Sequence, residues 1–146
     1  MPKISRLFIK TGLLYFILGL LLRVLIDFFT AFPIPVLTVL FWHALMLGWI
    51  TQIIMGVSIW MFPGRTREEG FKAQKLSWLT YLFLNAGLLL RMISSPLLEL
   101  SGLNFWAILL AVSAPFQLVG VLFYVFEMWP RIQSKKQRIR NRKKKG

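Results

Sequence analysis

The sequence contains no cysteine, a single histidine and only five acidic residues among its 146 residues. The absence of cysteine excludes disulfide bonds, iron–sulfur clusters and thiolate chemistry. One histidine is too few for a copper centre built from several imidazole ligands. The sequence also lacks a nucleophile–base pair, a phosphate-binding loop and a zinc signature, so it gives no support to a catalytic function.

Apolar side chains dominate what is present. Hydrophobic residues make up 57% of the chain and the mean hydropathy is +0.66, values well above those of a soluble domain of this size. Apolar runs long enough to span a bilayer predict four membrane helices, at about 7–29, 36–62, 74–95 and 105–130. Turns are expected at 31–35, 63–73 and 96–104. Residues 1–130 therefore predict an all-α membrane protein, a four-transmembrane-helix bundle.

Positive charge is concentrated at the ends and in one loop. The net charge is +13, and 16 of the 18 basic residues fall at the amino terminus, between the second and third helices, or in the tail at 131–146. By the positive-inside rule both termini are cytoplasmic, which predicts a multi-pass protein of the inner (cytoplasmic) membrane. The basic tail is expected to be disordered and to contact anionic lipids. It has no aromatic or folded motif that would indicate nucleic-acid binding.

A short internal repeat relates the two halves of the chain. The pentapeptide GLLLR occurs at 19–23 and again at 87–91, 68 residues later. The second helix of each half also ends alike, with MFP at 61–63 and MWP at 128–130. This pattern predicts a tandem two-helix repeat of the parallel kind, because each hairpin starts on the same side of the membrane.

The only histidine, His43, lies in a stretch of 28 residues without a charged side chain, Val36 to Pro63. On a regular helical wheel, Gln52 points away from His43, so neither face is expected to border lipid. The histidine begins a pattern of residues at fixed spacing: His43, Gly48, Trp49, Gly56, Val57, Pro63 and Arg65.

This pattern resembles a histidine-bearing helix of small relatives of haem-copper oxidase subunit I, a superfamily that includes nitric oxide reductase large subunits and NnrS-type membrane proteins. The resemblance covers about 23 residues and is otherwise limited to hydropathy and helix count. In that superfamily, histidines of membrane helices ligate haem iron or copper. The resemblance therefore implies haem as cofactor, with His43 as metal ligand, in electron transfer or gas sensing.

Two arginines fall inside predicted helices, Arg23 and Arg91, at a depth similar to that of His43. An arginine in hydrocarbon needs an anion, and Asp27 stands four residues after Arg23. A haem held by His43 would offer two propionates, which the guanidinium fork matches. This interpretation makes Arg23 and Arg91 the propionate partners. A second axial ligand would come from a methionine of another helix or from His43 of a second copy.

Other interpretations of the same residues stay open. The protein can be a cofactor-free structural or accessory subunit of a membrane complex, or a homo-oligomer, with Arg23 simply paired to Asp27. A transporter has weaker support, because no paired carboxylates mark a substrate path, and a channel formed by several copies is left open. The polar residues near mid-membrane, which predict hydrogen bonds between helices, are Gln52, Asn85 and Gln117. Glu127 and Arg131 predict an ion pair at the interface.

Overall fold

The computed structural model describes residues 1–28, 34–62 and 70–132, without the side chains of 70–74. Within these residues every regular element is a helix. The elements are α1 (Lys3–Phe28), α2 (Ile34–His43), the π-helix η1 (Ala44–Ile50), α3 (Thr51–Met61), α4 (Gly70–Ser101), α5 (Asn104–Met128) and the 3₁₀ turn η2 (Trp129–Arg131). α2, η1 and α3 follow one another without a break and form one rod, Ile34–Met61.

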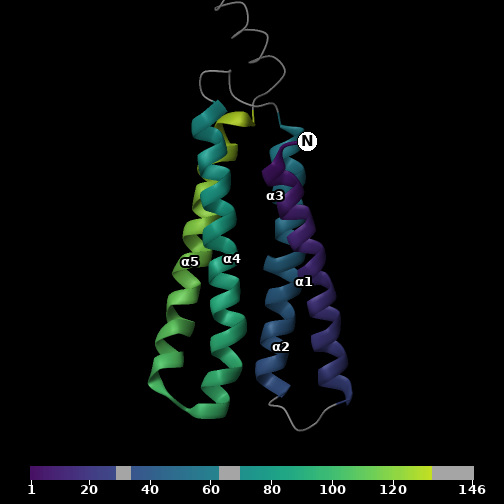
Figure 1. Cartoon of the computed structure of the whole chain (residues 1–146), viewed down its shortest axis with the longest axis vertical. Helices are drawn as coiled ribbons and strands as arrows, with labels where there is room; N and C mark the ends of the chain where they lie inside the picture. Colours follow the sequence, from purple (N-terminus) through teal and green to yellow (C-terminus); the bar gives the residue numbers. More distant parts are fainter. Residues whose placement is uncertain (29–33, 63–69, 133–146) are drawn as a thin grey trace, which may run out of the picture.

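The helices form two antiparallel hairpins (Figure 1). The first hairpin is α1 with the α2–η1–α3 rod, and the second is α4 with α5. The amino terminus, the end of α3, the start of α4 and the end of α5 lie at one end of the molecule, which we call the terminal end. The opposite end, where α4 turns into α5, is called the distal end. The chain thus crosses the bundle four times, up and down.

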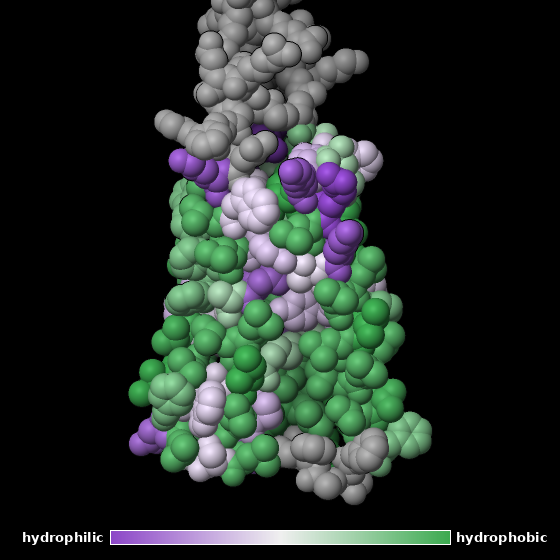
Figure 2. All heavy atoms as spheres, viewed as in Figure 1, coloured by the Kyte–Doolittle hydropathy of each residue, from purple (hydrophilic) through white to green (hydrophobic). Residues whose placement is uncertain are grey.

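The predicted membrane spans are confirmed. Four helices in the described part of the chain are long and apolar enough to cross a membrane: Lys3–Phe28, Ile34–Met61, Lys75–Ser101 and Asn104–Arg131. Large apolar side chains cover the outside, while several small or polar side chains are buried. Figure 2 shows hydrophilic residues gathered at the terminal end and a mostly hydrophobic surface along the helices. Such an exterior suits lipid, where packing and hydrogen bonds hold the helices together.

Each hairpin closes over glycines, which let two helix backbones approach. A Cβ added at Gly48 would lie 2.5 Å from Cγ of Tyr15. In the second hairpin, a Cβ at Gly87 would lie 2.8 Å from the backbone oxygen of Ser113, and one at Gly120 would lie 2.8 Å from the backbone nitrogen of Leu84. Nothing larger than hydrogen fits at these positions, so the glycines set the helix spacing.

Polar side chains join the two hairpins. Gln52 of α3 donates from Nε2 to Oδ1 of Asn85 in α4 at 2.9 Å, and both residues are buried. The hydroxyl groups of Thr11 and Tyr81 lie 2.7 Å apart, as do those of Ser58 and Tyr124. Phe8 of α1 and Tyr81 of α4 also pack edge to face, with ring centroids 5.1 Å apart. The predicted role of Gln52 and Asn85 in linking helices is therefore confirmed.

The third helix is longer than the sequence predicted. A turn was expected at 96–104, but α4 continues through Pro96 to Ser101. Proline removes one backbone hydrogen bond, which membrane helices tolerate when neighbouring groups compensate. The chain turns instead at Gly102, whose φ of +63° ends the helix, with its N–H donating to the Leu98 oxygen at 2.8 Å. α1 also begins earlier than expected, at Lys3 instead of residue 7.

Several sequence predictions fall partly or wholly outside the described residues. The proline connection was expected at 31–35; residues 31–33 are not described, and 34–35 already belong to α2. The polar loop was expected at 63–73; residues 63–69 are not described, and 70–73 already belong to α4, so the loop ends earlier than predicted. Of the basic tail at 131–146, only 131 and 132 are described. The predicted ion pair between Glu127 and Arg131 is described, and it is buried at the terminal end, where Arg131 Nη2 contacts Glu127 Oε1.

Candidate functional site

His43 is the last residue of α2, nine residues beyond Ile34 at the distal end. Its Nδ1 lies 2.8 Å from the backbone oxygen of Val39, one turn earlier. A carbonyl oxygen only accepts hydrogen bonds, so this contact places the proton on Nδ1 and leaves the lone pair on Nε2. Nε2 is therefore the atom through which His43 could bind a metal. The side chain is half-buried.

A π-helix begins directly after His43. Over Ala44–Ile50 the helix takes the wider turn, and at its end Met46 O accepts both the N–H and, at 2.7 Å, the hydroxyl of Thr51. π-helical segments are rare in proteins, and those that occur often lie at functional sites. The helical wheel that set Gln52 opposite His43 assumed a regular α-helix. The wider turn lies between the two residues, so that wheel does not apply across it.

Contacts between the hairpins set the depth of the predicted site residues. α1 and α4 run in the same direction with Thr11 beside Tyr81, so Arg23 lies near the level of Ile93. The α2–α3 rod runs the opposite way with Gln52 beside Asn85, so His43 lies near the level of Ser94. Both levels are within about three residues, or ~4.5 Å, of Arg91. The three side chains thus lie at a similar depth in the bundle.

Arg23 does not face the centre of the bundle. Its Nη2 lies 2.8 Å from Oδ1 of Asp27, and the two side chains are 56% and 46% exposed. The neighbouring residues Leu20, Leu21 and Val24 are exposed as well. This face of α1 is therefore turned away from the other helices. The sequence analysis left open that Arg23 simply pairs with Asp27, and the structure contains this ion pair.

Arg91 lies in a different setting. It is one turn from Leu88, which is fully buried, and one turn from Ser94, which is 1% exposed. Its Nε is buried and makes no hydrogen bond. No ion pair joins Arg91 to a carboxylate among the described residues, and no hydrogen bond or ion pair there connects Arg23, His43 and Arg91 to one another. The structure brings the three to one depth without joining them.

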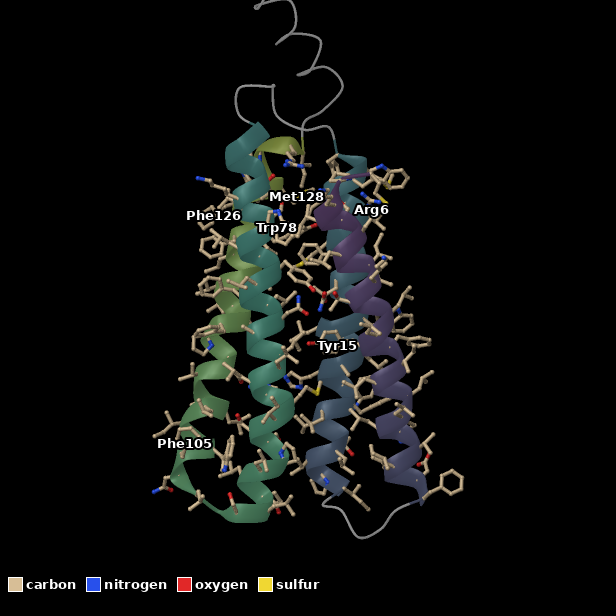
Figure 3. All side chains as sticks on the ribbon, viewed as in Figure 1. Arg6, Tyr15, Trp78, Phe105, Phe126 and Met128 are labelled. Carbon is tan, nitrogen blue, oxygen red and sulfur yellow. The ribbon has the colours of Figure 1, made fainter. Side chains whose placement is uncertain are left out.

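Gln117 and the tyrosines also differ from the sequence interpretation. Gln117 was expected to bond another helix, but its Nε2 is buried without a partner. Tyr81 and Tyr124, which the sequence analysis did not single out, supply hydroxyls to the bonds between hairpins. Figure 3 shows Tyr15 on the inner side of α1, whereas Phe105 and Phe126 point away from the bundle on α5. The only sign of Tyr81 and Tyr124 in the sequence was that each places a hydroxyl group within an apolar run.

The donor set can be tested against the implied cofactor. One imidazole with a free Nε2 and a proton on Nδ1 suits a single axial bond to haem iron. In the described part of the chain, no group of three or more His, Cys, Asp or Glu side chains comes together to hold a metal ion. The residues therefore fit one axial ligand of a haem, and they do not fit a copper centre.

No family model, curated protein or solved structure matches this chain. Fold and site therefore define the class: a four-helix membrane bundle with one histidine at the junction of an α-helix and a π-helix. The resemblance of the His43 segment to haem-copper oxidase subunit I stays a prediction.

Proposed function

We propose that this protein is a membrane haem protein, related to haem-copper oxidase subunit I, in which His43 binds haem iron for electron transfer or gas sensing. The observation that supports it is the bond between His43 Nδ1 and the Val39 oxygen, which directs the lone pair of the ring to Nε2. Histidines that bind metals usually donate their other ring N–H to a carboxylate, a backbone carbonyl or water, and His43 meets this condition. Haem would supply the redox or gas-binding chemistry.

The two arginines take unequal parts in this proposal. Within the residues that the structure describes, Arg91 has no carboxylate partner. It lies at the depth of His43, which suits it to a propionate. Arg23 would have to leave Asp27, to which it is bonded at 2.8 Å. We therefore expect loss of Arg91 to weaken haem binding more than loss of Arg23. The chain has one histidine, so a second protein ligand would have to be a methionine of another helix or His43 of a second copy.

An absorption spectrum of the detergent-solubilised protein, with and without dithionite, tests the proposal. Protein produced with a haem supply should show a Soret band that His43→Ala removes. Met46→Leu is the matched control, because Met46 is exposed three residues away on the same rod and should leave the band unchanged. Absence of the band after haem supplementation, or a wild-type spectrum from His43→Ala, would refute haem binding at this residue.

The alternative is a cofactor-free structural or accessory subunit of a membrane complex. Arg23 is already neutralised by Asp27, and His43 already satisfies one ring nitrogen within its own helix. Both observations favour a scaffold that needs no cofactor. This function predicts a partner that co-purifies in constant ratio with the tagged protein in mild detergent, without pigment. A colourless protein that runs alone on gel filtration would contradict it.

We also infer that the two hairpins are tandem copies and that both termini are cytoplasmic, in the inner (cytoplasmic) membrane. Gly19 and Gly87 open the repeated pentapeptide, and each packs against the second helix of its own hairpin. The basic tail would then meet anionic lipids, at about 1 kcal/mol per basic residue near the surface. Because the protein has no cysteine, single-cysteine labelling tests the orientation. Ser101→Cys should react with an impermeant maleimide in intact spheroplasts and Lys3→Cys should not; the reverse pattern would refute it.

A further inference from the structure

The second copy of the GLLLR repeat keeps the arginine but lacks the acid. In the first copy, Arg23 is followed four residues later by Asp27, and the two form an ion pair. In the second copy, Ser95 stands where the acid would be, four residues after Arg91. The next carboxylate along α4 is Glu99, eight residues or about 12 Å farther on and exposed. Among the described residues, the second arginine is thus not paired with a carboxylate.

Two further buried hydrogen-bond donors without partners lie in the second hairpin, each within about one helical turn of the level of Arg91. Ser94, three residues along the same helix, is 1% exposed, and its hydroxyl makes no hydrogen bond. Gln117 of α5 is 8% exposed, and its Nε2 makes none either. Buried donors in native proteins nearly always have a partner, so these three donors call for an acceptor that the described side chains do not supply.

The packing of the second hairpin directs Arg91 and Gln117 toward each other. A Cβ at Gly87 would lie 2.7 Å from Cγ of Gln117, so Gln117 lies directly across from Gly87. Arg91 is one turn beyond Gly87 on the same face. Side chains on a helix lean toward its amino terminus, and α4 and α5 are antiparallel. Arg91 therefore leans toward the level of Gly87, while Gln117 leans toward the level of Arg91.

We propose that Arg91, Ser94 and Gln117 bind one small monovalent anion between α4 and α5, either a halide or a single carboxylate group. The three side chains offer guanidinium, hydroxyl and amide donors, and a small anion can accept from all of them. Arg91 is only partly buried. This proposal goes beyond haem binding, because it requires neither His43 nor Arg23. Since the haem proposal also uses Arg91, the test employs haem-free protein.

The test measures thermal unfolding of the full-length, haem-free protein in detergent while chloride, formate or acetate replaces gluconate at constant ionic strength. Anions that bind only the folded state raise the midpoint in a saturable manner. We expect such a rise in the wild type and in Arg6→Met, a control that removes an exposed arginine of α1. In Gln117→Leu the half-saturating concentration should rise about tenfold or more, as one bond to the anion is lost. Arg91→Met should abolish the response.

The outcomes separate the sources of the anion. A response to chloride assigns a free halide, and a response to formate and acetate alone assigns the carboxylate of an organic ligand. If Arg91→Met fails to fold, Ser94→Ala and Gln117→Leu provide the test, because each should raise the half-saturating anion concentration in the same way. No saturable rise with any of the three salts, or an equal rise in Gln117→Leu, would overturn the proposal. If the protein binds haem but its haem-free form shows no anion response, only this site is refuted. If the protein responds to anions but takes up no haem when haem is supplied, only the haem proposal is refuted.

Discussion

The side chains of Gln52 and Asn85 bond each other in both directions across the two hairpins. Gln52 Nε2 donates to Asn85 Oδ1 at 2.9 Å. In return, Asn85 Nδ2 lies 3.4 Å from Gln52 Oε1. The same Nδ2 also donates to the backbone oxygen of Tyr81 at 2.9 Å. Among the described residues, the only hydrogen-bond partner of either amide within its own hairpin is that backbone oxygen. The pair therefore fixes how α3 lies against α4.

Removing one amide of this pair should destabilise the contact between the hairpins. Gln52→Leu leaves the Asn85 amide in an apolar setting, which costs about 1–3 kcal/mol. A double-mutant cycle with Asn85→Leu, measured by unfolding in mixed micelles, should give a coupling of about 0.6–1.7 kcal/mol. Ile54→Val, on the exposed face of α3, serves as the control. Strictly additive effects of the two leucine substitutions would contradict the role given to the pair.

Alanine at Gly48 should be more harmful than alanine at Gly19. The new methyl group at Gly48 would meet Cβ, Cγ and Cδ1 of Tyr15 at 2.5–2.8 Å, and Tyr15 is 6% exposed. At Gly19 it would meet the end of the flexible Leu45 side chain at 2.8 Å. Overpacking of a rigid neighbour costs about 1–3 kcal/mol, so Gly48→Ala should lower the unfolding midpoint clearly more than Gly19→Ala. Equal losses would mean that Tyr15 can move aside.

Gly102 should resist substitution for a conformational reason. Its φ is +63°, while a Cβ added there would meet nothing within 4 Å. Gly102→Ala therefore costs only the left-handed backbone strain, about 1–2 kcal/mol, and Gly102→Asn should cost less, since asparagine tolerates that conformation. Thermal unfolding of both variants in detergent checks the order. An alanine variant as stable as the wild type would show that the turn adopts another conformation.

Two ion pairs with the same spacing should respond differently to loss of the acid. Glu127 is fully buried and Arg131 nearly so, whereas Arg23 and Asp27 are both exposed. Glu127→Gln would leave a buried guanidinium without its carboxylate, at a cost of about 3–5 kcal/mol. Asp27→Asn should cost no more than about 1 kcal/mol. Chemical unfolding of the two variants measures the contrast, and equal losses would show that burial does not separate the pairs.

Sequence alone was enough to predict the helices and part of the polar contacts. Long apolar runs define membrane helices because lipid leaves the backbone few alternatives. Gln52, Asn85 and the pair of Glu127 with Arg131 stood out, since polar groups inside apolar runs need partners. The end of α4 was missed because Pro96 signals a break in water and not in a membrane helix.

The pairing of Arg23 with Asp27 could be predicted from the sequence, but the different burial of Arg23 and Arg91 could not. Both follow the same four residues, and helices that are apolar on every side give little sign of which face meets lipid. Only the packing of Gly19 and Gly87 against different partners, and the presence of Asp27, separates the two sites. The π-helix was also missed, because it depends on an extra residue per turn and not on any residue type.

The π-helix after His43 sets how α2 is rotated about the helix axis relative to α3. A π segment amounts to one inserted residue within an otherwise continuous α-helix. Deleting Leu47, which lies inside it, would let the rod return to regular winding while α2 and α3 keep their sequences. His43 would then swing around the helix axis relative to Gln52, whose direction Asn85 holds. The direction in which the only imidazole of the protein points thus depends on the count of residues between it and a fixed amide.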